Sequence, residues 1–309
     1  MATTKIDTHQ HYFPPAYIKN VGLDALARQT ADGKAPDWSP EAAIRMMDAN
    51  GIAEGILSVS SGPTISNAAE VLHQCNEYGA ELGPRYPGRF GLFASLPLPD
   101  IDASLREAAY CLDELKADGF IVFASYDGHY LGDALFDPLW EELDRRAAVV
   151  FIHPNQPPYV LPSVAPASVV EFPFETTRAA CSLILSGAMS KYSNIKFILS
   201  HAGGTLPYLR PRITLCISMI PGAAERVGDP AAAFRSFYYD TALAGAALPL
   251  AGLADITTPD HILFGSDFPM APLRAIEDFG AELDRLPLEG LSRSAIYRTN
   301  AEKLLGRTS

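Results

Sequence analysis

The chain has 309 residues, of which 48% are hydrophobic and 19% are charged. Lysine and arginine number 24 against 36 aspartate and glutamate residues, which gives a formal net charge of −12 and disfavours nucleic acid and anionic membranes as partners. No apolar run approaches the ~20 residues that a membrane helix needs, and no apolar signal segment precedes the first predicted strand. We therefore expect a cytoplasmic protein with no membrane span.

Short β-branched or aromatic runs alternate with amphipathic stretches from one end of the chain to the other, and this alternation predicts a parallel sheet covered by helices. The predicted strands are Lys5–His11, Gly55–Ser60, Phe90–Leu96, Gly119–Ala124, Val149–His153, Lys196–Ser200, Phe237–Thr241 and Ile262–Ser266. The predicted helices are Pro40–Asn50, Ala68–Leu82, Ile101–Ala117, Pro138–Arg146, Glu175–Lys191 and Leu273–Leu283.

The number of these units points to one architecture. Eight strands in roughly 300 residues favour closure into a (β/α)8 TIM-like barrel over an open doubly wound sheet. The first predicted strand is not followed by a Gly-x-Gly-x-x-Gly motif, which counts further against a dinucleotide-binding fold. No low-complexity linker divides the chain, so we expect residues 1–309 to form one domain.

Several predicted strands end in residues that can bind a metal or move a proton. His9 and His11 stand two residues apart on the first strand, so both side chains point to the same face. His153 ends the fifth strand, His201 directly follows the sixth, and Asp267 follows the eighth. The first and eighth strands are neighbours in a closed barrel, and active sites of such barrels form at these strand ends. The pattern predicts a catalytic metal centre with His9, His11, His153 and Asp267 as ligands.

Each of these residues also has a structural interpretation. His9 and His11 could be a hydrogen-bonded pair in the barrel mouth, and Asp267, before Phe-Pro, could cap a helix. His201 precedes Ala202-Gly203-Gly204, whose small size lets a backbone turn closely beside a ligand, and it could serve as an acid or base near the metal. The proline-rich stretch from Pro154 to Pro173 predicts a pocket wall or lid for an aromatic substrate, or else a subunit contact.

At these residues the chain resembles the amidohydrolase superfamily, and within it the metal-dependent decarboxylases of aminocarboxymuconate semialdehyde, γ-resorcylate and 6-methylsalicylate. Resorcylate-type enzymes have a glutamate where this chain has His9, so its first motif is closer to the other two types. The matching pieces, in the order of the family, are Ile6–Pro15, Ile152–Pro154, Ser200–Gly204 with Leu206–Tyr208 and Arg212–Ile213, Tyr239–Thr241, and Leu263–Pro269.

The resemblance implies one divalent metal ion held by the same four ligands, zinc in the first place and manganese as the alternative. It places His201 close to the metal-bound water or the substrate. It also implies a homodimer in which Arg212 matches an arginine that faces the neighbouring active site. No strand-borne lysine is positioned to bridge a second metal, which supports a single ion.

We expect non-oxidative decarboxylation of an ortho-hydroxyaryl carboxylate, with conversion of 6-methylsalicylate to 3-methylphenol and CO2 as the favoured case. The ring carbon that loses the carboxylate must be protonated, by Asp267 or by His201. Tyr12, Phe268 and Arg212 are the expected substrate contacts. The alternatives are a metal-dependent hydrolase or hydratase acting on a lactone or unsaturated acid, and a binding protein that has lost catalysis and holds no metal.

Overall fold

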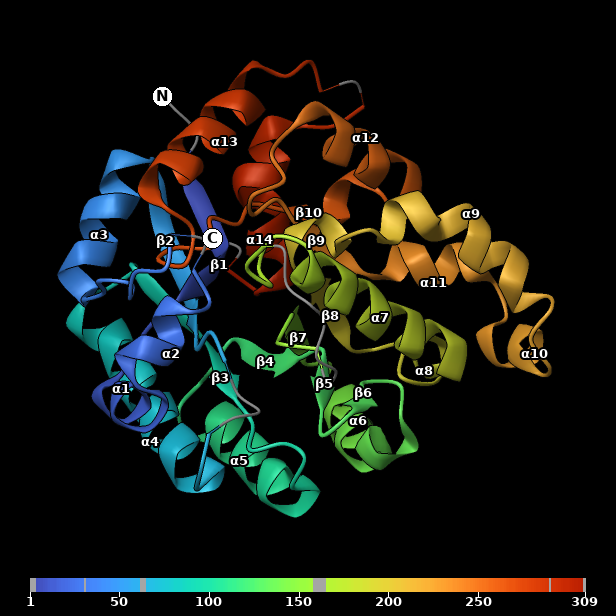
Figure 1. Cartoon of the computed structure of the whole chain (residues 1–309), viewed down its shortest axis with the longest axis horizontal. Helices are drawn as coiled ribbons and strands as arrows, with labels where there is room; N and C mark the ends of the chain where they lie inside the picture. The colour runs from blue at the N-terminus through green and yellow to red at the C-terminus, as the bar shows by residue number, and fades with distance from the viewer. Residues whose placement is uncertain (1–3, 31, 62–64, 158–164, 289, 308–309) are drawn as a thin grey trace.

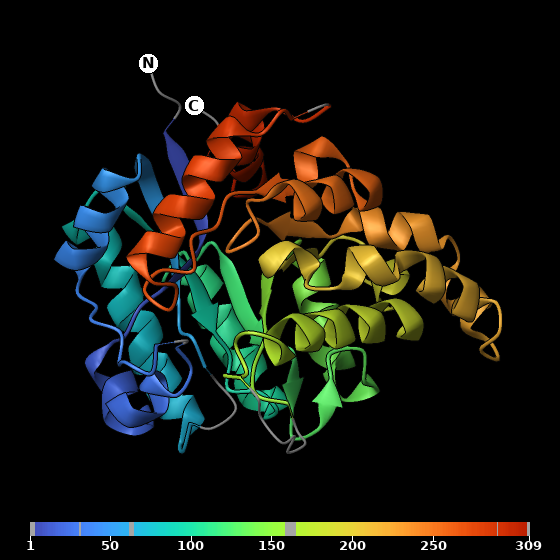
Figure 2. The same cartoon turned by 45° about the horizontal axis from the view of Figure 1, so that its top comes forward.

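The computed structural model describes residues 4–30, 32–61, 65–157, 165–288 and 290–307, and the described part contains an eight-stranded parallel sheet with helices around it (Figures 1 and 2). The strands are paired in chain order, each with the next. They are β1 (Lys5–His11), β2 (Ile52–Ser58), β3 (Phe90–Ser95), β4 (Gly119–Phe123), β7 (Val149–His153), β8 (Lys196–Leu199), β9 (Tyr238–Asp240) and β10 (Ile262–Leu263). The sequence predicted a strand in each of these eight places.

The sheet closes between its first and last strands. β10 pairs with β9 only as far as Leu263, two residues in all, so it is shorter than the predicted Ile262–Ser266. The residues after it turn toward β1, and three backbone hydrogen bonds join the two: Thr8 N to Phe264 O (3.0 Å), Asp267 N to His9 O (2.8 Å) and His11 N to Phe268 O (2.7 Å). These bonds complete the barrel that the alternating pattern predicted, and they bring Asp267 beside the end of β1.

Helices follow most strands and cover the outside of the barrel. Ser39 and Asp100 cap two of them by accepting the backbone N–H groups of Ala42 and Ala103, which have no partner inside their helices. The helices are α1 (Pro15–Val21), α2 (Leu23–Ala27), α3 (Pro40–Ala49), α4 (Ala68–Arg85), α5 (Ile101–Asp113), α6 (Asp137–Arg145), α7 (Glu171–Ser186), α8 (Ala188–Lys191), α9 (Leu206–Ile217), α10 (Ala223–Val227), α11 (Pro230–Ser236), α12 (Ala247–Ile256), α13 (Leu273–Arg285) and α14 (Asn300–Leu304).

Two of the differences from the predicted elements lie in the middle of the chain. The helix predicted over Glu175–Lys191 begins earlier, at Glu171, and breaks at Gly187, whose φ of 84° is left-handed. A Cβ at this position would lie 2.7 Å from the carbonyl oxygen of Arg226, so only glycine lets α10 approach here. A small antiparallel hairpin of β5 (Ser125–Tyr126) and β6 (His129–Tyr130), absent from the prediction, follows β4.

The two ends of the barrel have different roles. β4 and β7 are buried along their whole length, as expected for strands covered on both faces. At the N-terminal end of the barrel, α14 contacts β1 and β10, and Arg307 pairs with Glu54 and Asp118 at 2.6 and 2.9 Å. These contacts stabilise the N-terminal end of the barrel. The opposite end, where the strands finish, is the end at which a site can form. Among the described residues, no helix has both the length and the apolar character to cross a bilayer.

Candidate metal centre

Four potential ligands meet at the C-terminal end of the barrel. His9 and His11 come from β1, His153 ends β7, and Asp267 stands in the segment that closes the barrel. One donor atom from each lies within 4.8 Å of the others, and all four residues are buried. The sequence predicted this grouping from the strand ends, and the structure brings its members together.

The donor atoms of this group are spaced closely enough to bind one cation together. Nε2 of His9 and Nε2 of His11 lie 3.2 Å apart, and both lie 3.2–3.3 Å from Oδ1 of Asp267. Oδ1 of Asp267 and Nδ1 of His153 are buried and have no hydrogen-bond partner among the described residues. Buried polar atoms are nearly always paired, so converging donor atoms without partners indicate an ion site. Three imidazoles and a carboxylate are ligands that zinc and manganese both accept.

Neighbouring groups orient the two rings on β1. Nδ1 of His9 lies 2.7 Å from Oδ2 of Asp240, which is fully buried at the end of β9. Nδ1 of His11 lies 3.3 Å from both the carbonyl oxygen and the hydroxyl of Ser58. With each Nδ1 held from behind, each Nε2 faces the centre, as in other metal sites whose ligating histidines bond an outer partner.

Two of the four ligands are charged in the metal-free site and two are neutral. Burial opposes a charged His9 ring, but the carboxylates of Asp240 and Asp267 outweigh it and raise its pKa to about 10. Burial lowers the pKa of His11 and of His153, which keeps these rings neutral. Burial also disfavours an ionised Asp267, but the neighbouring His9 and His11 hold its pKa well below the usual range. Without a metal, the protonated His9 ring lies between the carboxylates of Asp240 and Asp267.

His201 lies beside the four ligands in a strained turn after β8. Its φ is 52°, a left-handed value that is uncommon for residues other than glycine and is often found at functional sites. Its Nδ1 lies 3.1 Å from the carbonyl oxygen of Ala242, which can only accept, so Nδ1 carries a proton and Nε2 is free to exchange one. Glycine is needed at position 204 because another part of the backbone packs closely against it. A Cβ on Gly204 would lie 2.0 Å from the carbonyl oxygen of Pro173.

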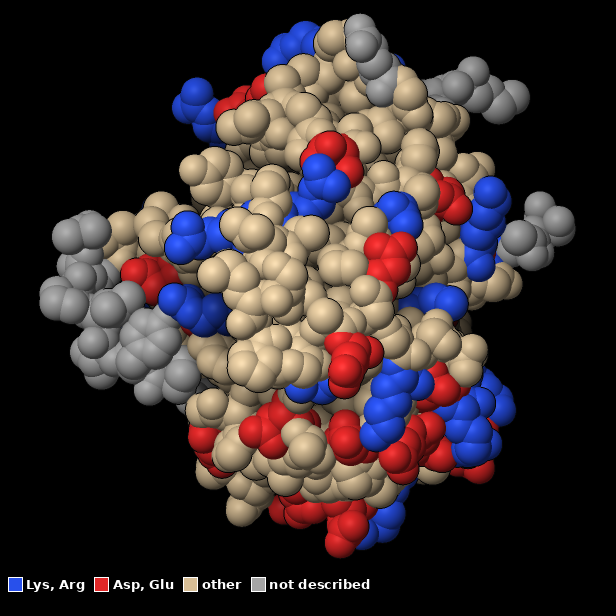
Figure 3. Space-filling model, turned by 90° about the vertical axis from the view of Figure 1, so that its right-hand side faces the viewer, with Lys and Arg blue, Asp and Glu red and all other residues tan. Residues whose placement is uncertain are grey.

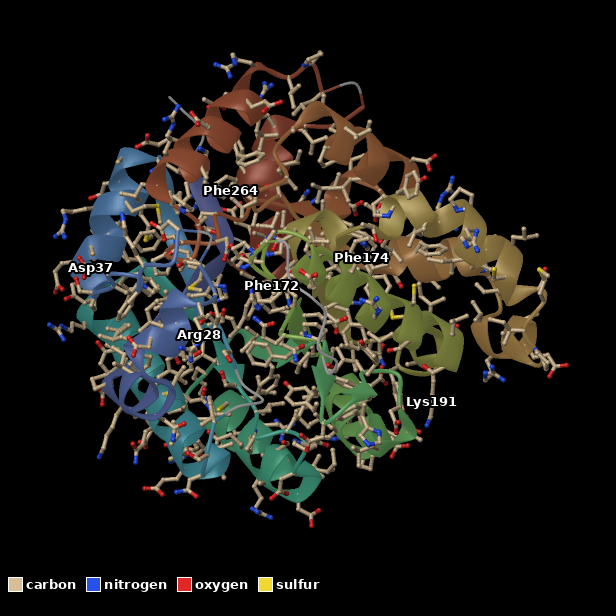
Figure 4. All side chains as sticks on the ribbon, in the orientation of Figure 1. Arg28, Asp37, Phe172, Phe174, Lys191 and Phe264 are labelled. Carbon is tan, nitrogen blue, oxygen red and sulfur yellow. The ribbon has the colours of Figure 1, made fainter. Side chains whose placement is uncertain are left out.

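A cavity of about 340 Å³ opens onto the metal centre. Phe172, at the start of α7, points toward the barrel axis, whereas Phe174 two residues later points away (Figure 4) and is 41% exposed. Within the described part of the chain, no lysine or arginine lines the cavity. Its walls are formed by Gln29, Ser60, His153, Ser168, Val169, Phe172, Pro173, His201, Gly204, Leu243, Ala244, Asp267, Met270, Ala271 and Pro272.

The predicted wall from Pro154 to Pro173 contributes its second half to this cavity. Ser168, Val169, Phe172 and Pro173 line it, and the hydroxyl oxygen of Ser168 is buried and has no hydrogen-bond partner within the described ranges. Residues 158–164 lie outside the described part, so the prediction for that segment stays a prediction.

The three predicted substrate contacts do not line the cavity. Tyr12 and Phe268 each follow a ligand by one residue. Tyr12 is fully buried and donates its hydroxyl to the carbonyl of Cys75 on α4, and Phe268 is buried without lining the cavity. Arg212 is exposed on α9, on the outside of the molecule. Adjacent residues of an extended segment face opposite sides, so the position of Tyr12 next to His11 at the end of β1 does not predict a place in the pocket.

Sequence reasoning gave no role to Asp240, although the signal was available. It ends β9 as His153 ends β7, and the same strand-end argument would have placed it at the barrel mouth. Leu243 and Met270 had no such signal, because they lie on loops without a periodic pattern and Leu243 adopts a left-handed φ of 53°.

Comparisons with known proteins agree on one family. A family model described as amidohydrolase matches residues 6–307. The chain is 38% identical to a 6-methylsalicylic acid decarboxylase from Penicillium expansum, covering 89% of this chain and 88% of that protein. A crystal structure of an amidohydrolase II superimposes with a TM-score of 0.89 at 29% identity, covering 98% and 100%. A Polaromonas dihydroxybenzoic acid decarboxylase, solved with manganese and 2-nitroresorcinol, shares the fold with a TM-score of 0.81 at 24% identity, covering 99% and 98%.

Proposed function

Because the chain belongs to the amidohydrolase family, we propose that its metal centre decarboxylates an ortho-hydroxyaryl acid, with 6-methylsalicylate as the favoured substrate and 3-methylphenol and CO2 as the products. The family resemblance indicated by the motifs is confirmed, and the similar proteins include decarboxylases. The observation that carries the proposal is the buried group of three histidines and one aspartate opening into a largely apolar cavity.

The cavity suits a small aromatic acid with a single charge. Its volume of about 340 Å³ fits one substituted ring, and Val169, Phe172, Leu243 and Met270 offer apolar contacts to the ring and a methyl group. No lysine or arginine among the described lining residues can balance the substrate carboxylate. The carboxylate is therefore expected at the metal ligands, where a bound cation would hold it together with the adjacent hydroxyl and draw electron density from the ring.

The side chains around this position supply the proton. His201 presents Nε2 as its exchangeable nitrogen, and we propose that this atom delivers the proton to the ring carbon that carries the carboxylate. A new C–H bond forms there, the bond to the carboxylate breaks, its electron pair restores the aromatic ring, and CO2 leaves. Asp267 lines the same cavity and is the second candidate for this proton transfer.

We propose a single divalent ion, zinc first and manganese as the alternative, since the four donors form one group. The manganese in the solved Polaromonas enzyme supports the alternative. We further propose that the chain is one cytoplasmic domain. The contact of α14 with β1 and β10 joins its two ends, and its four cysteines are free, as expected in a reducing compartment.

Metal binding should release about one proton at neutral pH, because only His9 must lose its proton to become a ligand. The pKa of His9 lies near 10, so affinity should rise about tenfold per pH unit from pH 7 toward pH 10 and weaken as pH falls. Titration calorimetry in buffers with different ionisation enthalpies measures the number released. A release of zero, with affinity independent of pH, would show that His9 is neutral in the metal-free protein.

The outer face of α9 supports the proposed homodimer. Tyr208 and Leu215 are 86% and 63% exposed on this helix, and Leu248 on the neighbouring α12 is 85% exposed. Figure 3 shows this side of the molecule with uncharged surface over much of its middle and upper part, interrupted by several charged residues, and with a denser group of charged residues below. An exposed apolar area of this kind marks an interaction surface. Arg212 lies on the same helix, where a second copy could receive it.

A charge within this face should separate the subunits. We expect the double variant Leu215→Asp/Leu248→Asp to sediment as a monomer, because two carboxylates would be buried without partners in the interface. Leu23→Asp is the matched control, since Leu23 is 51% exposed on the distant α2 and should keep the dimer. Sedimentation velocity measures both, and a wild-type protein that sediments as a monomer at all concentrations would refute the homodimer.

The function itself is tested with metal-reconstituted protein and a panel of ortho-hydroxybenzoates that includes 6-methylsalicylate. Mass spectrometry should show products lighter by CO2, and a chelated sample should show none. Gain of water in place of loss of CO2 would indicate the hydrolase or hydratase chemistry. No reaction across the panel, with the metal demonstrably bound, would refute decarboxylation of these acids.

A further inference from the structure

The carboxylate of Asp240 stands between the metal centre and His201, and both of its oxygens are used. Oδ2 lies 2.7 Å from Nδ1 of His9. Oδ1 accepts the backbone N–H groups of His201 at 2.8 Å and of Ala242 at 3.0 Å. The residue is fully buried at the end of β9, which lies between β8 and β10 (Figure 1). One side chain therefore contacts a predicted ligand and the turn that carries the predicted proton donor.

The contact with His9 decides which of its nitrogens carries the proton once a metal is bound. An ionised carboxylate can only accept hydrogen bonds, so Nδ1 of His9 must be the donor. In a neutral ring the proton on Nδ1 leaves Nε2 with its lone pair, and Nε2 is the atom that faces His11 and Asp267. Asp240 thus selects the tautomer of His9 that can bind a metal through Nε2.

The other oxygen fixes the position of His201. It holds the backbone N–H of His201, whose left-handed φ of 52° needs support from its surroundings. It also holds the N–H of Ala242, and the carbonyl of Ala242 accepts the Nδ1–H of the His201 ring. Both the main chain and the ring of His201 therefore depend on the same carboxylate oxygen.

We propose that Asp240 is a positioning residue shared by the two functions of the site: it makes Nε2 of His9 available to the metal, and it places the His201 ring beside the cavity. This inference rests on the proposed metal centre but not on the identity of the substrate. It predicts that metal affinity and turnover are both sensitive to a residue that touches neither the ion nor the substrate.

Asp240→Asn separates these roles, because the orientation of the new amide is determined. Its carbonyl oxygen must take the place of Oδ1, which accepts two N–H groups, so its NH2 group faces Nδ1 of His9. His9 then has to accept at Nδ1, which moves its proton to Nε2, the ligand atom. We expect metal affinity to fall by about 10- to 100-fold, the usual effect of losing an outer partner of a ligand, while the thermal midpoint shows a folded protein.

The matched control is Tyr239→Phe on the same strand. It removes a buried hydroxyl that donates to the carbonyl of Phe234, away from the metal centre, and should leave metal affinity unchanged. Competition with a chromophoric chelator measures both affinities. Equal affinity in Asp240→Asn and wild type would overturn the proposal.

A second measurement needs no variant. In zinc-loaded wild-type protein with labelled histidine, NMR should show a proton on Nδ1 of His9, and its absence would overturn the proposed tautomer. A wild-type protein that binds no divalent ion would overturn this inference together with the proposed function. A third outcome separates the two proposals. If wild-type protein binds the metal tightly and Asp240→Asn shows the predicted fall in metal affinity, but no acid is decarboxylated, the inference is supported and only the proposed function is refuted.

Discussion

Replacing His201 with asparagine should lower kcat for decarboxylation by about 10²- to 10⁴-fold, the usual contribution of a general acid, while metal content stays at the wild-type level. Asparagine is the informative choice because it tolerates left-handed backbone, and the φ of His201 is 52°. Its amide cannot exchange a proton near neutral pH. His201 is not one of the four grouped ligands, so the metal should remain bound.

Steady-state kinetics together with elemental analysis test this prediction. His129→Asn is the matched control: this side chain is 49% exposed, its Nδ1 bonds Asp133 at 2.8 Å, and it does not line the cavity, so kcat should not change. If His201→Asn keeps kcat within a few-fold of wild type, the proton comes from another group, and Asp267 becomes the first candidate.

Replacing Asp267 with asparagine should abolish turnover and weaken metal binding at the same time. The variant removes the only carboxylate among the four ligands. The loss of affinity should exceed the about 10- to 100-fold that the loss of an outer partner causes. The backbone bonds of Asp267, from its N–H to His9 and from Ala271 to its carbonyl, do not involve the side chain, and asparagine accepts its φ of 62°. The barrel should therefore still close.

Measuring activity at saturating metal distinguishes the two roles of Asp267. No turnover with the metal restored would place the carboxylate in the chemistry as well as among the ligands. Full turnover would reduce it to a ligand, and full activity without added metal would remove it from both roles. Asp278→Asn is the control, because Asp278 is 70% exposed on α13 and, among the described residues, forms an ion pair only with Arg274, at 3.5 Å.

The strand ends could be predicted because they obey simple periodic rules. His9 and His11 share a face through the two-residue repeat of a strand, and the order of strands in a closed barrel places Asp267 beside them. The strands themselves were recognisable from buried runs such as Val149–His153. The ligand group therefore follows from local patterns together with one topological assumption, barrel closure.

The walls of the cavity could not be predicted in the same way. Four lining residues come from loops without a periodic sequence pattern: Gln29, Ser168, Leu243 and Met270. Leu243 has a left-handed backbone conformation, which a sequence usually indicates by a glycine, and no glycine stands there. Tyr12 was predicted to contact the substrate, but its side chain packs against α4. Which loop residues meet over a barrel depends on tertiary packing, and a single sequence does not encode it in any local pattern.

Turnover of 6-methylsalicylate in D2O by the metal-loaded protein tests directly whether the ring carbon gains a proton as its bond to the carboxylate breaks. If the ring carbon is protonated as CO2 leaves, the 3-methylphenol formed should carry one deuterium, located by NMR between the hydroxyl and the methyl group. CO2 should appear in equal amount, and both should disappear on chelation. A product that keeps its carboxylate, or 3-methylphenol without deuterium at that position, would contradict the proposed reaction.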